Sequence, residues 1–117
     1  KGKKAAQLAE EVEQGTAASA KGGTYVLQDP DTGQVMRTGR TKDHTRRELE
    51  HNRQPETKGL QYGREVRTDD YSVQRGHEQI LHDEHKPPLD KIRPISPKNP
   101  RRDEYLEAAR KYMGSKR

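Results

Sequence analysis

The spacing of apolar and polar residues in the first third of the chain predicts a β-hairpin. Two extended runs, residues 24–28 and 34–38, flank the segment Asp29-Pro30-Asp31-Thr32-Gly33. In that segment the proline presets φ, an aspartate caps the turn and the glycine accepts a positive φ, as a tight turn between antiparallel strands requires. A further run, residues 60–68, lacks clean alternation and is a candidate third strand.

Two helices are predicted after this hairpin. Residues 39–41 turn the chain, Asp43 provides an N-cap, and the first helix ends near Gln54-Pro55 because proline restricts the residue before it. Residues 71–85 form the second helical pattern, with an N-cap within residues 68–70. Its core-facing stripe contains Val73, His77, Ile80, Leu81 and Glu84, and Glu78 lies beside that stripe.

The last third of the chain is a proline-punctuated loop followed by a helix. The loop covers residues 89–99, and its large aliphatic residues are expected to anchor it to the body of the domain. These residues are Leu89, Ile92 and Ile95. Asn99 and Pro100 provide the N-cap and first position of a helix that Gly114 ends. One face of this helix carries Tyr105, Leu106, Ala109, Tyr112 and Met113.

The N-terminal residues are predicted to be a connector. Residues 1–20 begin with a short amphipathic pattern and end in a flexible run that has no group suited to catalysis. The chain therefore divides into residues 1–21, an N-terminal helix and linker to an upstream region, and residues 22–117, the domain proper. The expected fold class of this domain is α+β, a small three-stranded antiparallel sheet flanked by helices.

Composition indicates a small core. Of the 117 residues 26% are hydrophobic and 37% are charged, and the aromatic side chains are five Tyr, with no Phe or Trp. Such a chain is close to the composition of disordered proteins, so we expect marginal stability, to which a bound partner would add. The absence of Cys excludes disulfides, Cys-ligated zinc and a thiol nucleophile. No apolar run approaches the roughly 20 residues that span a bilayer.

The net charge of +5 suits a polyanionic partner such as nucleic acid, although charges of both signs are interspersed. Arg47 and His51 are four residues apart and face the same way on the predicted helix. Together with three further arginines they are expected to form a phosphate cradle at one end of the hairpin. The four arginines are Arg37, Arg40, Arg46 and Arg47. A solvated basic face is the alternative interpretation.

Other catalytic and metal-binding patterns are not met. His77 and His82 are five residues apart, whereas the zincin helix places its histidines four apart. His82 and His85 precede two prolines and are more typical of a hydrated helix end. The serines lack a nucleophile-elbow context and the Gly-rich stretches do not match a P-loop.

The order of the hairpin and helix residues resembles the GIY-YIG nuclease superfamily. Gly23-Thr24-Tyr25 stands in place of the first tripeptide, the second strand ends at Gly39, and Arg47 and His51 follow on a helix. The segment RGHEQIL, residues 75–81, resembles the family helix that carries the metal-binding Glu, which here is Glu78. The resemblance covers residues 22–112.

The end of the chain resembles one branch of that superfamily. The segment ISPKNPRRDEYLEAAR, residues 95–110, is similar to the C-terminal toxin domains of bacterial polymorphic toxins of the Rhs and contact-dependent inhibition types. The family's late Asn would correspond to Ser96 or Asn99. The second tripeptide departs from the family, because it reads Arg37-Thr38-Gly39 where a Tyr usually stands. An arginine there can stabilise a transition state but cannot accept a proton.

The resemblance implies a metal-dependent endonuclease that hydrolyses DNA phosphodiester bonds with little sequence specificity. Glu78 would hold Mg²⁺ or Mn²⁺ and Arg47 would hold the phosphate, with Arg37 beside it. Tyr25, through a relay with His51, would orient or deprotonate the attacking water. Side chains that bind the nucleic-acid backbone would be Arg40, Lys42, Arg46, Arg53 and Arg75.

The resemblance also implies a biological setting. A toxin of this kind would be secreted or injected from the producing bacterium as part of a larger protein, would act in the target-cell cytoplasm, and would be neutralised by an acidic immunity protein. It would not enter a membrane. Three alternatives stay open: an RNase of the same fold, a non-catalytic nucleic-acid-binding module, and an interaction domain recognised by a protein. The acidic residues that would serve the last alternative are Glu48, Glu50, Asp69 and Asp70.

Overall fold

The computed structural model describes residues 20–115, which form a three-stranded antiparallel sheet and three helices. The elements are β1 (Gly23–Gln28), β2 (Val35–Thr41), α2 (His44–Arg53), β3 (Gln61–Arg67), α3 (Tyr71–His85) and α4 (Arg102–Ser115). The strand order is β2-β1-β3, so β1 is central. This confirms the predicted α+β class. The predicted N-terminal helix lies outside the described residues, which include only residues 20 and 21 of that segment.

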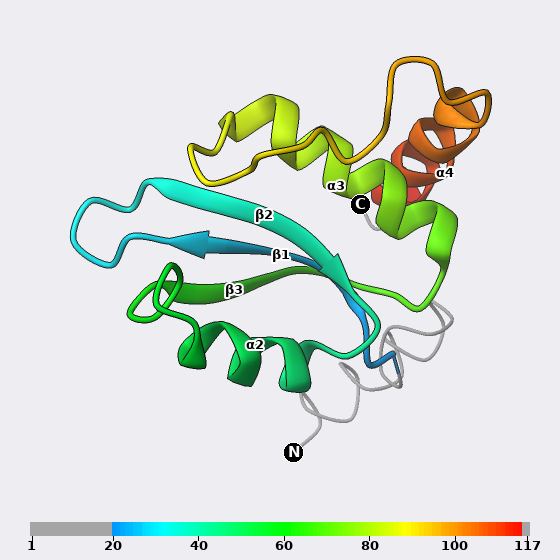
Figure 1. The fold of residues 1–117 in the computed structure, drawn as a ribbon. Coiled ribbons are helices and arrows are strands. Elements are labelled where there is room, and N and C mark those ends of the chain that lie inside the picture. Colours follow the sequence, from blue (N-terminus) through cyan, green and yellow to red (C-terminus); the bar gives the residue numbers. More distant parts are fainter. Residues whose placement is uncertain (1–19, 116–117) are drawn as a thin grey trace.

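Three layers make up the domain (Figure 1): α2 lies against one face of the sheet, α3 covers the other face, and α4 packs against α3. Because side chains alternate along a strand, β1 serves both layers. Thr24 hydrogen-bonds to His77 of α3, whereas Tyr25 hydrogen-bonds to His51 of α2. Val26 packs in the small apolar cluster on the α3 side.

The starts of α2 and α3 follow the predicted caps. The Asp43 carboxylate accepts a hydrogen bond from the backbone N–H of Arg46 at 3.2 Å and begins α2. Asp70 accepts from the backbone N–H groups of Ser72 and Val73 and begins α3. Each contact satisfies an N–H group that has no partner within the helix.

Three details of the prediction are wrong. Residues 39–41 were expected to turn the chain, but they continue β2, since Gly39 pairs with Tyr25 of the central strand. The last helix begins at Arg102, because residues 99–101 form a turn in which the Asn99 side chain accepts from the Arg101 N–H, and it continues past Gly114 to Ser115.

The loop between α3 and α4 docks on the free edge of β2. The backbone N–H of Leu89 donates to the Met36 carbonyl at 2.9 Å, and Ile95 is fully buried. Both residues therefore anchor the loop as expected. The third expected anchor, Ile92, is wrong, because its side chain is 83% exposed.

Candidate functional site

The Tyr25 ring lies against β2, the strand that carries Gly39. Gly39 is the cross-strand partner of Tyr25, and a Cβ at Gly39 would collide with the Tyr25 ring and hydroxyl. On its other side the ring stacks on Tyr62 of β3, with ring centroids 4.7 Å apart and an interplanar angle of 18°. The Tyr25 side chain is therefore held between two strands, and its hydroxyl has one defined position beneath α2.

Two side chains of α2 meet the Tyr25 hydroxyl. His51 Nε2 lies 2.9 Å from it, and Arg47 donates from Nε at 3.2 Å. Arg47 and His51 share a face because they are one helical turn apart. A second nitrogen of Arg47, Nη1, donates to the Glu50 carboxylate at 3.0 Å, which fixes the direction of the guanidinium. These contacts bring together three of the residues that the sequence singled out.

Thr57, in the turn after α2, determines which His51 nitrogen carries the proton. The Thr57 hydroxyl donates to the His51 carbonyl at 2.7 Å, which uses its only hydrogen. The same oxygen lies 3.3 Å from His51 Nδ1, so this contact assigns a proton to Nδ1. Nε2 is then an acceptor, and the Tyr25 hydroxyl donates to it. No motif or spacing in the sequence singles out Thr57.

Electrostatics favour the neutral form of both groups. Burial, followed by the charges of Arg47 and Arg37, lowers the pKa of His51 to about 4. Burial raises the pKa of Tyr25, against the hydrogen bond from Arg47 that lowers it. At neutral pH the Tyr25 phenol and the His51 imidazole are thus both neutral, in agreement with the hydrogen-bond directions.

Glu78 belongs to the opposite side of the sheet. Its carboxylate lies 3.4 Å from Arg40 Nε, and its side chain is 17% exposed. Burial raises the pKa of Glu78 to about 7, with Asp90 adding to the rise and Arg40 opposing it. Glu78 is also among the charges that raise the pKa of Tyr25. The two groups therefore interact electrostatically although they project from different layers.

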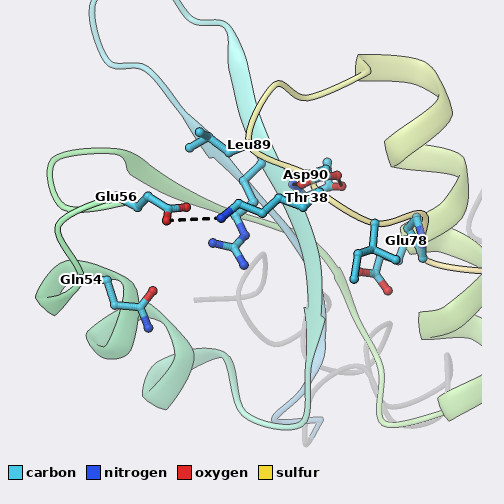
Figure 2. Close-up of a pocket in the computed structure, with 10 residues that line it drawn as sticks. Thr38, Gln54, Glu56, Glu78, Leu89 and Asp90 are labelled. Carbon is cyan, nitrogen blue, oxygen red and sulfur yellow. Dashed lines mark hydrogen bonds and ion pairs between the residues drawn. The ribbon is translucent and has the colours of Figure 1, made fainter.

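A pocket of about 430 Å³ lies at the edge of β2 and is lined by residues from both sides of the sheet. In Figure 2, β2 runs between Glu78 on one side and Gln54 and Glu56 on the other. Arg37 also lines this pocket, and strand alternation puts it on the same face as Gly39 and Tyr25. The pocket thus gives one ligand access to Arg37 and Glu78, whereas Tyr25, Arg47 and His51 are not among the residues that line it.

The predicted cradle of four arginines is divided by the sheet. Arg37 and Arg47 lie on the Tyr25 side, whereas Arg40 pairs with Glu78 and lies over the Tyr71 ring, 5.0 Å from its centroid. Arg46 is an exposed side chain near Glu50. The four arginines therefore do not converge on one point in the fold.

The other predicted backbone-binding residues differ in their availability. Lys42 and Arg53 are exposed. Arg75 is used inside the fold, because it donates to the Tyr71 hydroxyl at 2.6 Å and to the Pro94 carbonyl at 3.3 Å. The two candidates for the late polar position, Ser96 and Asn99, both hydrogen-bond within their own loop.

The histidines of α3 have structural partners. His77 Nδ1 lies 2.7 Å from the Thr24 hydroxyl, and His82 Nδ1 lies 2.9 Å from the Asp90 carboxylate. His82 is therefore paired and partly buried, which differs from the expected hydrated helix end, whereas His85 is exposed at the end of α3 as expected. Among residues 20–115 no group of three or more His, Cys, Asp or Glu is placed to hold a metal ion, so a cation at Glu78 would have at most one further ligand of these types.

Comparison with protein-family models, with curated proteins and with solved structures found no match. In the part of the chain that the structure describes, no helix is long and apolar enough to cross a membrane. The site is therefore interpreted from its own geometry.

Proposed function

We propose that the chain is a metal-dependent endonuclease that hydrolyses phosphodiester bonds of DNA with little sequence specificity. The observation that carries this proposal is the Tyr25 hydroxyl, which lies 2.9 Å from the acceptor nitrogen of His51 and 3.2 Å from Arg47 Nε. A hydroxyl between a neutral base and a cation is suited to proton transfer next to an anionic phosphate.

In this proposal the Tyr25 oxygen takes a proton from the attacking water while its own proton passes to His51 Nε2. The water oxygen then bonds to phosphorus as the bond to the leaving oxygen breaks, and the leaving oxygen takes a proton from solvent. His51, whose pKa is lowered to about 4, returns its extra proton to solvent and is again neutral. Arg47 keeps Nε on Tyr25 and Nη1 on Glu50, and its remaining nitrogen, Nη2, donates to a non-bridging phosphate oxygen. Arg37 adds a second positive charge on the same face.

Glu78 fits a hard divalent cation. Mg²⁺ retains several waters in proteins and is commonly held by one or two carboxylates plus substrate phosphates, so a single carboxylate in a polar pocket suffices. When bound, Mg²⁺ or Mn²⁺ would neutralise charge on the scissile phosphate and on the leaving oxygen. Arg40 Nε lies 3.4 Å from Oε1 of the same carboxylate, so a bound cation would share this carboxylate with Arg40 or displace it.

The substrate class follows from charge. The chain carries a net charge of +5, and Lys42, Arg46 and Arg53 are exposed on and before α2. Such side chains contact phosphates and do not read bases, which supports binding with little sequence preference and strong salt dependence.

The test is incubation of plasmid DNA and Mg²⁺ with the wild-type chain, Glu78→Ala and Arg47→Ala. We expect wild type to cut and both variants to lose roughly hundredfold or more in rate, since each removes a group that stabilises charge at the phosphate. Arg110→Ala, an exposed arginine on α4, is the matched control and should cut normally. Intact DNA with wild type, or full activity in both variants, would refute the proposal. RNA in the same assay distinguishes an RNase.

A non-catalytic nucleic-acid-binding module is the second candidate. Two observations favour it: the Glu78 carboxylate is already paired with Arg40, and Arg37 stands where the resembling family has a proton-accepting Tyr. DNA binding without metal-dependent cleavage in the assay above would select this candidate.

The proposed setting is that of an antibacterial toxin domain, delivered from the producing cell within a larger protein and active in the target cytoplasm. It rests on the resemblance of residues 95–110 to polymorphic-toxin ends. A basic toxin is best neutralised by an acidic immunity protein. A small acidic reading frame immediately downstream is expected, and its absence would count against this role.

A further inference from the structure

The loop after α3 ends in an exposed tip with an unusual composition. Its three residues are Lys91, Ile92 and Arg93, an aliphatic side chain between two cations. Ile92 is 83% exposed, the most exposed of the large hydrophobic side chains in the described part of the chain. Burying an isoleucine stabilises a fold, and the folded domain does not obtain this contribution at Ile92.

The tip is held firmly on its N-terminal side. Leu89 donates its backbone N–H to the Met36 carbonyl of β2 at 2.9 Å. The Asp90 carboxylate accepts from the Thr38 N–H at 3.0 Å, from the Thr38 hydroxyl at 2.6 Å, and pairs with His82 at 2.9 Å. Asp90 thereby fixes the loop to both β2 and α3.

The C-terminal side of the tip is held equally well. Ile95 is fully buried and donates its backbone N–H to the buried Gln79 side chain at 2.9 Å. Arg75 donates to the Pro94 carbonyl at 3.3 Å. Between these two anchors only the three tip residues project, so Ile92 is presented on a rigid support rather than on a long free loop.

The tip also borders the pocket at the edge of β2. Lys91 and Ile92 line that pocket together with Arg37 and Glu78. Lys91 has one long contact, 3.8 Å to Glu56, and its side chain is 76% exposed. An exposed pair of this kind contributes little energy, so the ammonium group is available to an incoming anion.

We propose that this tip is a wedge for the minor groove of duplex DNA, in which Ile92 enters a base step while Lys91 and Arg93 bind the flanking phosphates. The inference rests on the proposed function for its substrate class and adds how that substrate is held. Aliphatic wedges of this kind partly unstack one step and kink the duplex, which brings more backbone onto the protein. Here the kink would direct the adjacent phosphates toward Arg37 and Glu78.

The chemistry of the tip favours duplex DNA over the other occupants. Single strands are bound by stacking bases on aromatic side chains, and the tip has none. A protein partner would use a wider apolar patch than one isoleucine between two cations. The two cations instead match the phosphates on either side of a narrow groove.

The experiment measures binding and bending of an end-labelled DNA duplex of about 20 base pairs by anisotropy and energy transfer, in EDTA so that no cleavage occurs. The full chain is compared with Ile92→Ala, with the double variant Lys91→Gln/Arg93→Gln, and with Met113→Ala as matched control. Met113 is a partly exposed hydrophobic residue on α4 that does not line the pocket.

We expect Ile92→Ala to bind about tenfold more weakly and to lose the bend, because the methyl groups that enter the step are missing. The double variant should reduce the slope of log Kd against log salt by roughly 0.9 for each cation removed. Met113→Ala should behave as wild type. All variants should keep the wild-type thermal midpoint, since the substituted side chains lie at the surface.

The outcomes separate the wedge from the proposed hydrolysis. If wild type binds duplex DNA and Ile92→Ala binds and bends it equally well, the wedge is refuted whether or not wild type cleaves with Mg²⁺. If Ile92→Ala loses the bend but wild type never cleaves, the wedge stands and the hydrolysis falls. If wild type binds no duplex DNA, the wedge is refuted, and weaker capture of a protein by the tip variants would then indicate a protein partner.

Discussion

Thr57 is the residue that orients the base of the proposed site. Thr57→Val keeps the shape of the side chain but removes the hydroxyl that accepts from His51 Nδ1. The imidazole can then protonate on Nε2, which blocks the acceptor that faces Tyr25. We expect the cleavage rate to fall roughly tenfold to hundredfold, a fraction of what a general base contributes. ¹⁵N NMR of His51 should show the tautomer change directly.

The matched control for this substitution is Thr57→Ser, which retains the hydroxyl. It should keep both the Nδ1–H tautomer and the rate. Thr57→Val also leaves the buried His51 carbonyl and Nδ1–H without this partner, at a cost of about 1–3 kcal/mol in unfolding free energy. A variant that loses stability but keeps rate and tautomer would show that Thr57 is only structural.

The sequence indicated the main residues of the site but not the hydrogen bonds that orient them. Arg47 and His51 were predictable as a pair because helical spacing is a local property, and Tyr25 joined them only through the family resemblance. Thr57 was missed because its contact depends on a turn that folds back beneath α2. Asp90 was missed for a similar reason, since its partner Thr38 is 52 positions away and only the docking of the loop brings the two together.

At the scale of elements, caps and breakers predicted α2 and α3 better than they predicted α4 or the end of β2. The bounds of α3 agree with the expected residues 71–85, because Asp70 and the prolines after it mark both ends locally. The end of β2 was predicted too early because Gly39 suggested a turn. Pairing with β1 overrides that local preference, and the glycine serves to admit the Tyr25 ring.

Gly39→Ala should therefore disturb the sheet where the site is built. The new Cβ would occupy the position of the Tyr25 ring, which would have to leave the Tyr62 stack and the hydroxyl contacts to α2. Overpacking of this kind costs about 1–3 kcal/mol in unfolding free energy. Near-UV circular dichroism should report it cleanly, because the chain has no Trp and the signal comes from tyrosines.

Gly63→Ala is the control for this prediction. Gly63 lies on β3 opposite Val26, and an added Cβ would meet a Val26 methyl group at 3.3 Å, which a small shift relieves. We expect a smaller change in stability and an unchanged tyrosine spectrum. Equal effects of the two substitutions would mean that the Tyr25 ring does not depend on the bare backbone at Gly39.

At the scale of the whole molecule, buried polar groups occupy places where aliphatic side chains would usually lie. His44, His51 and His77 are each at most 5% exposed, and each has hydrogen-bond partners inside the fold. This explains how a chain with 26% hydrophobic residues folds into defined layers. Composition correctly indicated a small core, but it could not show that histidines complete it.

These histidines make stability depend on pH in a defined direction. Burial lowers the pKa of His44, His51 and His77 from 6.5, to about 4 for His51. Below pH 6.5 the unfolded chain takes up protons that the folded chain does not, so their contribution is complete above 6.5 and is lost as pH falls toward 4. For His51 alone the loss is at most about 3 kcal/mol.

Glu78 acts in the opposite direction over an overlapping range. Its pKa is raised from 4.5 to about 7, so the folded chain keeps a proton that the unfolded chain releases. Glu78 therefore destabilises the fold progressively as pH rises from 4.5 to 7.

Because three histidines oppose one glutamate, we expect the urea midpoint of wild type to fall on acidification from about pH 7 to about pH 5. Glu78→Gln removes the opposing contribution and should steepen that fall, whereas Glu107→Gln, at an exposed position of α4, should leave it unchanged. A wild-type midpoint that rises on acidification, or a Glu78→Gln curve parallel to wild type, would contradict this balance of buried charges.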